Sequence, residues 1–356
     1  MIEQVVKALA DENDWHSILD TPEYFLDAID LQNESFKFVK TTRETLSTSS
    51  FLDGRTGLST DGDDYFLPIK EVLSWDKGSI AKRPVNRFIF HMSFCGSTLV
   101  SRVFDQPSIA TSHKEPKILL QLAEIKAANL DWYRNRQQWQ ALMRFVLEQL
   151  SKRWSPDEPV VIKPSNWANS MLPQLIEDGG PSRAMFLSIS PSDFLISVFR
   201  GGSDRVQFTY AVLKHLVIAF PEFTSIVAEV EADNLSSTDM FARLSLIVHA
   251  IQQKAFVRSS GNASLIAQYQ CNYHELLNSP AECLQHAVSA LDLSFKTSQL
   301  NESINKNFNN HSKVTKRSFD VYEARKVDQQ VCAVYNDTFS RSFEWAEKNL
   351  TSNKFC

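Results

Sequence analysis

The sequence predicts a three-layer α/β/α fold with a mostly parallel central sheet, preceded by an N-terminal accessory region. Short apolar runs alternate with longer helical patterns from about residue 84 onward, which is typical of strands joined by crossover helices. The length of 356 residues, with 43% hydrophobic and 22% charged residues, suits one large α/β domain or two modest ones. A glycine-containing loop follows the first apolar run, where folds of this class bind ligands.

We assign residues 1–83 to the accessory region, of mixed α and β character, and residues 84–356 to the main domain. In the accessory region, "TPEYFLDAIDLQ" begins with a threonine cap, a proline and a glutamate, which predicts the start of a helix. "FKFVKTTRETL" alternates like an exposed strand, and "STDGDDYFLPI" joins turn residues to an apolar run. We expect this region to pack onto the main domain.

The main domain contains candidate strands and helices in alternation. The strands are expected at residues 87–91, 108–112, 159–162, 184–189 and 263–270. Helical patterns lie between them, for example at residues 117–128, 139–153, 193–199 and 245–257. This alternation predicts a parallel sheet covered on both faces, with ligands bound outside the carboxyl ends of its strands.

Charge and cysteine usage indicate a soluble, cytoplasmic protein. The net charge of −5 argues against duplex nucleic acid as the main partner. The five cysteines contain no C-x-x-C pair and are odd in number, which favours reduced thiols over a disulfide framework. The first 15 residues carry acids, no apolar run is long enough for a membrane span, and no His, Cys or acidic spacing suggests a metal site. We therefore expect no membrane, nucleic-acid or metal partner, whereas the oligomeric state is not evident.

The stretch "FHMSFCGSTLVSRVFD", residues 90–105, has the pattern of a strand end, a tight loop and a helix start. Gly96 lets the backbone approach an anion, and Ser97 and Thr98 offer hydroxyl and N–H donors at a helix N-terminus. A nucleotide-hydrolysing loop, GxxxxGK[ST], would need lysine where Ser97 stands. The loop could therefore hold one phosphate or sulfate group, or it could be a plain helix cap after a strand.

Two motifs resemble those of the sulfotransferase superfamily. "SFCGST" occupies the frame of that family's first motif, PRSG[ST]T or PKSGTT, and "ISPSDFLIS", residues 189–197, is similar to its second, R-x-P-x-D-x-x-x-S. The resemblance implies a P-loop, nucleotide-kinase-like fold and transfer of a sulfuryl group from 3′-phosphoadenosine 5′-phosphosulfate to a hydroxyl or amine. It also implies that Ser197 contacts the 3′-phosphate. The donor would be held by the loop residues Ser93, Phe94, Cys95, Gly96, Ser97 and Thr98.

Two further stretches fit the same family in the same order. "VVIKPSNWANSMLPQL" resembles a family strand that ends in Lys-x-Pro or Lys-Pro, and "QYQCNYHELLNSPAECLQHAVSALDLSF" resembles a late "YEDLLxDPxxxLxxxxxFLGL" segment. The second stretch also has the pattern of an ordinary helix entry and amphipathic helix, so it supports the fold and not the chemistry. Together the matches span about residues 86–295.

Two positions depart from the family pattern, because Phe94 and Ile189 replace basic residues that contact the sulfate and the 3′-phosphate in that family. A phosphate in a partly buried pocket needs cationic or several neutral donors. The cations that could compensate are Lys163, Arg200, Lys313 and Arg317, the last two in the polar stretch "NNHSKVTKRSFD". Each could equally be an ordinary solvated side chain.

Sulfuryl transfer requires a base for the acceptor hydroxyl, and "TSHKEP" supplies two candidates. His113 titrates near neutrality, and Glu115 could serve if burial raised its pKa. We favour Glu115, although "KEP" could also be a plain helix start. Lys163 is a further catalytic candidate, and Cys95 is expected to have a pKa lowered by the helix dipole.

Three functions remain open at this point. The first is a sulfotransferase with a small-molecule or peptide acceptor that the sequence does not identify. The second is a catalytically degenerate protein of the same fold that binds a nucleotide or a partner, because two basic residues are lost. The third is a small-molecule kinase, which the missing lysine and the lack of an evident magnesium-binding aspartate disfavour.

Overall fold

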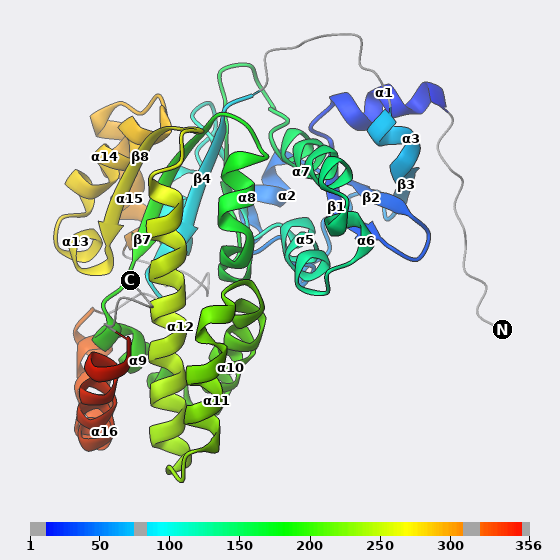
Figure 1. Ribbon diagram of the computed structural model, residues 1–356. Helices are drawn as coiled ribbons and strands as arrows, with labels where there is room; N and C mark the ends of the chain where they lie inside the picture. The colour runs from blue at the N-terminus through cyan, green and yellow to red at the C-terminus, as the bar shows by residue number, and fades with distance from the viewer. Residues whose placement is uncertain (1–11, 75–83, 309–320, 351–356) are drawn as a thin grey trace.

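The computed structural model describes residues 12–74, 84–308 and 321–350 (Figure 1). The main domain is built on a five-stranded parallel sheet with the order β5-β6-β4-β7-β8. The strands are β4 (Asn86–His91), β5 (Thr111–Lys114), β6 (Val160–Lys163), β7 (Ser182–Ser188) and β8 (Leu265–Asn272). The predicted α/β class with a parallel central sheet is thereby confirmed.

The first strand of this sheet, β4, lies at its centre. All six of its residues are buried, and the rings of Phe88 and Phe90 stack with their centroids 4.9 Å apart. The chain leaves β4 toward β5 and β6 on one side and then crosses to β7 and β8 on the other. Ligands in such sheets bind outside the carboxyl ends where the winding reverses, which is the end of β4.

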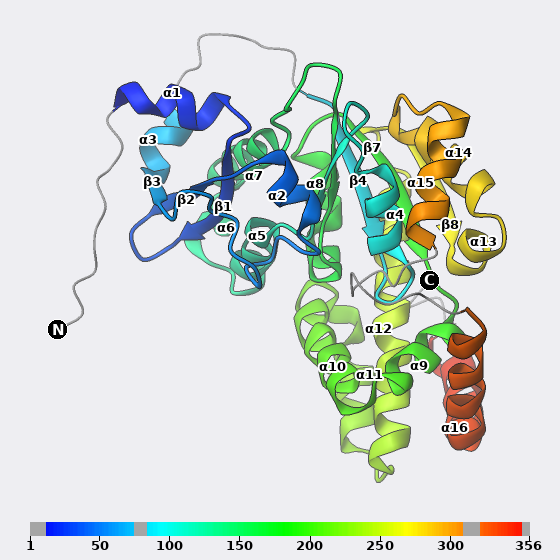
Figure 2. The same cartoon turned by 180° about the vertical axis from the view of Figure 1, so that it is seen from behind.

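Helices cover both faces of the sheet, as the two opposite views show (Figure 1, Figure 2). One face carries α4 (Ser97–Phe104), α14 (Pro280–Leu291) and α15 (Thr297–Phe308). The other carries α8 (Leu172–Glu177) and α12 (Ser237–Ser260). The ring of Phe256 on α12 packs 5.2 Å from that of Phe186 on β7, which joins this helix layer to the sheet.

A group of helices extends beyond the carboxyl edge of the sheet (Figure 1). They are α9 (Pro191–Arg200), α10 (Gly202–Ala219), η2 (Pro221–Phe223), α11 (Thr224–Ala232), the first part of α12, and α16 (Val321–Leu350). Across the described residues, none of the helices alone has the length and apolar character needed to cross a bilayer. Only α10 and α11 taken together, with a bend of 118° between them, meet that test.

The N-terminal region forms its own antiparallel sheet with the order β1-β2-β3. Its elements are α1 (Glu12–Asp20), β1 (Tyr24–Asp30), β2 (Ser35–Lys40), α2 (Arg43–Thr48), β3 (Asp64–Pro68) and α3 (Ile69–Ser74). The helix start predicted from "TPEYFLDAIDLQ" is wrong, because these residues pair with β2 as strand β1. β2 is also not exposed: Phe36 and Phe38 are both fully buried. Aromatic and β-branched side chains packed between layers outweigh a local capping signal.

This N-terminal sheet packs against α5 (Lys117–Ala127) and α7 (Arg136–Leu150), which are joined by α6 (Asp131–Arg134). The side-chain amide of Gln121 exchanges two hydrogen bonds with the backbone of Ile29, at 2.9 and 3.0 Å. Lys152 donates to the carbonyl oxygens of Ile18 and Tyr24. The accessory region is thus fixed to the main domain, whereas the boundary at residue 83 stays a prediction because residues 75–83 lie outside the described part.

The second strand of the main sheet lies three residues later than predicted from residues 108–112. Gln106 and Ala110 form an antiparallel bridge around a tight turn, and Ser108 within it has a left-handed φ of 64°. The apolar pair Ile109 and Ala110 therefore belongs to a buried turn, and the strand runs from Thr111 to Lys114. This shift moves His113 from the edge of the sheet into its interior.

Two of the five cysteines depart from the expected reduced state. Cys271, at the end of β8, forms a disulfide with Cys283 in α14. The expectation of reduced thiols is wrong for this pair. Cys95 and Cys332 are free thiols, and Cys356 lies outside the described residues.

Candidate functional site

The loop after β4 makes a sharp turn into α4 through two residues with left-handed backbone. Phe94 has φ 66° and Gly96 has φ 81°. A Cβ atom at Gly96 would lie 3.2 Å from Cδ2 of Leu276 and 3.7 Å from Cε2 of Tyr273, both in α13 (Tyr273–Asn278). Gly96 is therefore needed for its backbone conformation and for the close approach of α13. The segment around Tyr273, expected to support only the fold, borders the loop directly.

The side chains of this loop are largely covered by their neighbours. Ser93, Ser97 and Thr98 retain exposures of 7%, 6% and 5%, whereas Phe94 and Gly96 are half-buried. Neither of the two cavities described below borders the loop. The loop thus presents a narrow face to solvent, and the half-buried ring of Phe94 packs toward Phe194 of α9 and Phe208 of α10.

Cys95 differs from its expected chemistry. Its side chain is fully buried, and Sγ donates a hydrogen bond to the carbonyl oxygen of Met92 at 2.8 Å. Burial raises the pKa of the thiol to about 12, which outweighs hydrogen bonds from Ser97 that act in the opposite direction. The expectation of a lowered pKa and a reactive thiol is therefore wrong.

Two asparagines of η1 (Asn166–Met171) fasten the loop to the segment after β6. Asn166 Nδ2 donates to Oγ of Ser93 at 2.6 Å, and Asn169 Nδ2 donates to the carbonyl oxygen of His91 at 3.1 Å. His91 itself contacts the carbonyl oxygen of Pro164 through Nε2 at 3.0 Å. Neither asparagine was predicted from the sequence, although the four polar residues within "SNWANS" follow a buried strand and could have indicated them.

The ends of β5 and β6 bring Glu115 and Lys163 together. Lys163 Nζ donates to Oε1 of Glu115, and the backbone N–H of Glu115 donates to the carbonyl oxygen of Lys163 at 2.7 Å. The Lys163 side chain is fully buried, and that of Glu115 is 16% exposed. Glu115 has a φ of 58°, and a left-handed non-glycine residue of this kind costs about 1 kcal/mol and is common at functional sites.

The N-terminal region contributes to the surroundings of this pair. The ring of Phe51 lies 5.8 Å from Nζ of Lys163 and 4.1 Å from the guanidinium carbon of Arg55. Arg55 also donates to Asp53 at 2.7 Å. The backbone N–H of Leu52 donates to the carbonyl oxygen of Lys114, which fixes this segment beside the end of β5. The accessory region therefore forms one wall next to the Glu115–Lys163 pair.

His113 does not reach this edge of the sheet. It lies within β5 with 3% exposure, and its ring packs edge-on against Phe25 of β1 at 5.2 Å. Burial lowers the pKa of His113 to about 3. A core histidine under the N-terminal sheet cannot act as the base, so Glu115 alone of the two candidates lies at the carboxyl edge.

Arg205, which the sequence analysis missed, lies between the loop and the segment that contains Ser197. Its guanidinium carbon is 5.0 Å from the centre of the Phe94 ring, and its NH1 donates to the carbonyl oxygen of Ser197 at 2.7 Å. Burial lowers the pKa of the Arg205 guanidinium. Among the described residues, no carboxylate forms an ion pair with it. Its place eight residues after Ser197, in the next helix, gave no motif by which to find it.

Ser197 and Arg200 lie on α9, close to Arg205. Ser197 is buried, with 5% exposure, whereas Arg200 is partly exposed and ion-paired. Arg200 NH1 forms a 2.7 Å ion pair with Oδ1 of Asp328 on α16. Asp193 of the second motif accepts from Oγ of Ser190 at 2.6 Å and contacts Nε2 of His274 at 2.8 Å. The second motif and the turn after it thus face α13 and α16, and Arg200 already has an acidic partner.

Two predicted cations, Lys313 and Arg317, lie outside the described residues. Within the described ranges, no cluster of three or more His, Cys, Asp or Glu side chains could hold a metal ion.

No family model and no curated protein matches this chain. Three solved structures that it resembles are all sulfotransferases. The sulfotransferase domain from the curacin biosynthetic pathway is 13% identical over 72% of this chain and 99% of that one, with a TM-score of 0.35. Sulfotransferase STF9 from Mycobacterium avium is 14% identical over 76% of this chain and 79% of that one, also at 0.35. A sulfotransferase from Alicyclobacillus acidocaldarius is 14% identical over 76% and 98%, at 0.32. At TM-scores this low the similarities carry no argument about chemistry, which must come from the residues of the site.

Proposed function

We propose that this protein transfers a sulfuryl group from 3′-phosphoadenosine 5′-phosphosulfate to a hydroxyl or amine of an acceptor. The observation that carries the proposal is Arg205, a half-buried cation placed between the loop and Ser197 without a carboxylate partner in the described chain. Asp328 attracts this cation through space without pairing with it, and Arg200 repels it. A half-buried charge without an ion-pair partner is costly, so this position favours an anion. Arg205 supplies the positive charge that the loop lacks at Phe94.

The donor would lie with its sulfate against the Ser93–Thr98 loop and its 3′-phosphate near Ser197 and Arg200. Backbone N–H groups at the start of α4 and the helix dipole favour a negative group there. Because the half-buried ring of Phe94 lies against the guanidinium of Arg205, it has to swing away when the donor binds to that arginine. The 3′-phosphate would replace Asp328 as the partner of Arg200.

In the transfer step, the acceptor oxygen or nitrogen bonds to sulfur while the bond from sulfur to the bridging oxygen breaks. Glu115 takes the proton of the acceptor, and the bridging oxygen leaves with the electron pair on the nucleotide phosphate. Lys163 is a positioning residue, because its ammonium donates a hydrogen bond to the Glu115 carboxylate and fixes its place at the edge of the sheet. Arg205 and the N–H groups of α4 stabilise the charge on the leaving phosphate.

A second candidate function is nucleotide or partner binding without catalysis. It is favoured by the contact of the Phe94 ring with Arg205 and by the ion pair of Arg200 with Asp328, because both cations already have neighbours within the protein. Under this alternative, the nucleotide binds and no sulfuryl group is transferred to any acceptor.

Calorimetric titration with adenosine 3′,5′-bisphosphate, the product nucleotide, tests the proposal. We expect saturable binding that Arg205→Met weakens by at least about tenfold, as loss of a charge-assisted contact does. Arg258→Met, on the distant end of α12, is the matched control and should bind like the wild type. Absence of binding to the wild type at about millimolar nucleotide would refute donor binding. Binding without turnover of the sulfated donor would instead select the second candidate.

A further inference from the structure

A cavity of about 470 Å³ lies beside the proposed site and belongs to neither the loop nor the Glu115–Lys163 pair. It is enclosed by the end of α5, by η1 and α8, and by the end of α10. Its volume falls within the range of small-molecule sites. Its lining includes Lys126, Tyr133, Ser170, Gln174, His215 and Ile218.

The cation of this cavity, Lys126, has only neutral partners. Its Nζ donates to the carbonyl oxygen of Ser170 at 2.5 Å and to Oε1 of Gln174 at 3.2 Å. Within the described part of the chain, no carboxylate forms an ion pair with it, and burial alone lowers its pKa to about 8. An ammonium has three donors, so one remains for a further acceptor. A negative group bound in the cavity would offset the desolvation cost of this charge.

A second polar pair lies next to this ammonium. Oγ of Ser170 is 3.0 Å from Nε2 of His215, and both residues are buried. The rim of the cavity at the end of α10 is apolar and open, with Ile218 56% exposed beside Ala219 and Pro221. The cavity therefore combines a cation and hydrogen-bonding groups with an apolar surface. This arrangement suits a ligand with one carboxylate and an apolar body.

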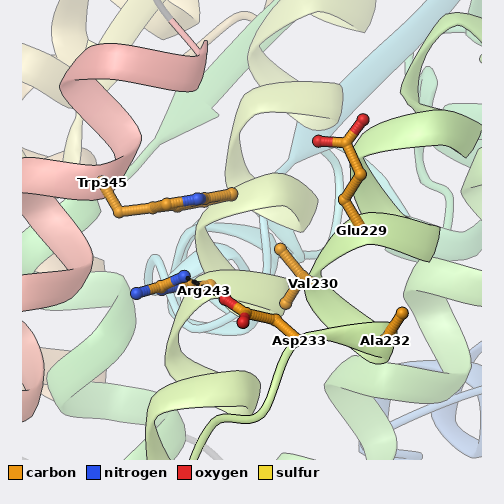
Figure 3. A pocket seen from close by; sticks show the side chains of 6 residues that line it. All are labelled: Glu229, Val230, Ala232, Asp233, Arg243 and Trp345. Carbon is orange, nitrogen blue, oxygen red and sulfur yellow. Dashed lines mark hydrogen bonds and ion pairs between the residues drawn. The ribbon is translucent and has the colours of Figure 1, made fainter.

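The other cavity, of about 410 Å³, is different in this respect (Figure 3). It lies between α11, α12 and α16, where the ring of Trp345 covers the guanidinium of Arg243 at 5.3 Å. Arg243 already forms an ion pair with Asp233 at 3.3 Å. The charge of Arg243 is thus compensated within the protein, and this cavity has no feature that favours an anionic ligand.

The Lys126 cavity is connected to the proposed reacting groups by two elements. α5 begins two residues after Glu115, and η1 begins three residues after Lys163. The four residue-to-residue steps from Asn166 to Ser170, at the rise of a 3₁₀-helix, span roughly 8 Å. A molecule of ordinary metabolite size could therefore reach from the cavity to the edge that holds Glu115.

We infer that the cavity at Lys126 binds the carboxylate of the acceptor, and that the acceptor is a small apolar-bodied carboxylic acid. The identification of this ligand as the acceptor rests on the proposed function, whereas the binding of an apolar-bodied carboxylate does not. Lys126 is a specificity-determining residue in this scheme, because it distinguishes acids from neutral molecules of the same shape.

The test is a ¹⁹F NMR titration of the full chain with 4-fluorobenzoate and its neutral counterpart 4-fluorobenzamide, without nucleotide. We expect 4-fluorobenzoate to saturate at about millimolar concentration, as small fragments do, and the amide to bind at least about fivefold more weakly. Lys126→Met should weaken 4-fluorobenzoate at least about tenfold and leave the amide unchanged, whereas Lys126→Arg should retain most of the preference for the acid.

A second variant keeps the test decisive if Lys126→Met does not fold. Ile218→Glu adds a negative charge at the exposed rim and should weaken 4-fluorobenzoate by about threefold or more. The matched control is Ile266→Glu, at a position with 55% exposure on β8, which should have no effect. The proposal is overturned if the wild type shows no saturable binding up to about 20 mM, or if Lys126→Met binds the acid as the wild type does.

The outcome is independent of the nucleotide titration. If 4-fluorobenzoate binds and adenosine 3′,5′-bisphosphate does not, the carboxylate site stands and the sulfuryl-transfer proposal fails. If the nucleotide binds and 4-fluorobenzoate does not, only the inference about Lys126 is overturned.

Discussion

The guanidinium of Arg205 lies over the ring of Phe94, with 5.0 Å between the guanidinium carbon and the ring centre. Phe94 stands where the first motif of the sulfotransferase superfamily has a basic residue. In this chain a cation lies at the same place but comes from Arg205, at the start of α10. The same arginine donates to the carbonyl oxygen of Ser197. One side chain thereby joins the two motifs that the sequence analysis placed at the donor site.

The Glu115–Lys163 pair allows a test of two opposing energies. Glu115→Gly should relieve about 1 kcal/mol of left-handed backbone strain. It also leaves Lys163, which is fully buried, without its carboxylate, and breaking such a pair costs about 3–5 kcal/mol. We therefore expect the free energy of unfolding, measured by urea titration, to fall by about 2–4 kcal/mol.

Glu115→Gly in a Lys163→Met background is the control for this first prediction. With the buried cation removed, the glycine substitution should be neutral or stabilising. An equal loss of stability in both backgrounds would contradict the ion pair as the cause.

Glu115→Gln should lower turnover at least about a hundredfold with little change in nucleotide affinity, because a base contributes at least that much to the transfer step.

The ion pair between Arg200 and Asp328 leads to a second prediction. If the 3′-phosphate must displace Asp328, then Asp328→Asn should strengthen binding of adenosine 3′,5′-bisphosphate by about twofold to fivefold, since partly exposed ion pairs are worth about 1 kcal/mol or less. Calorimetry measures the change, and Asp337→Asn on the same helix is the control. Unchanged or weaker binding in Asp328→Asn would show that Arg200 does not contact the phosphate.

The sequence predicted those features of the fold that depend on long-range alternation of apolar runs and helical patterns. Two of the buried strands after residue 84 contain short apolar runs, residues 88–90 in β4 and residues 160–162 in β6, and such runs bounded by helical patterns favour a parallel sheet. Prediction failed where a local signal competed with packing. At Tyr24–Asp30, the preceding Thr-Pro-Glu favoured a helix, but pairing with β2 made a strand.

The candidate site was predictable at the ends of strands and not between helices. Glu115 directly follows β5, Lys163 is the last residue of β6, and Gly96 lies in the loop after β4, so the parallel sheet places all three at the same edge. Arg205 and Asn166 reach the loop through helix packing, which no motif records. The misplacement of His113 came from the turn around Ser108, whose left-handed backbone is not apparent from residue type.

The burial of His113 predicts a pH dependence of stability. Its pKa in the folded protein is about 3, below the usual value near 6.5 that applies in the unfolded chain. Between these two pH values the unfolded state binds a proton that the folded state does not. Stability is therefore fully present above pH 6.5 and falls as the pH is lowered toward 3, by about 1.4 kcal/mol per pH unit for this group.

His113→Leu should reduce the slope of the free energy of unfolding against pH by about 1.4 kcal/mol per pH unit between pH 3 and 6.5. Urea titrations at several pH values measure this slope. The variant should keep its affinity for adenosine 3′,5′-bisphosphate, since His113 lies away from the carboxyl edge. An unchanged slope, or a loss of turnover without loss of stability, would contradict the assignment of His113 to the core.

Gly96 gives the last prediction, because two separate costs meet at this residue. An alanine there would take a φ of 81° and would bring its Cβ within 3.2 Å of Leu276. The left-handed backbone of an alanine costs about 1–2 kcal/mol. The close contact with Leu276 adds to this cost, because the capping box of Asn272 and Glu275 holds α13 in place and limits its movement away from the loop. Gly96→Ala should therefore lower the free energy of unfolding by more than the backbone term alone. The same substitution in a Leu276→Ala background should cost only that term, since the clash is gone. A double-mutant cycle from urea titrations measures the difference, and a coupling energy of zero would mean that α13 does not press on the loop.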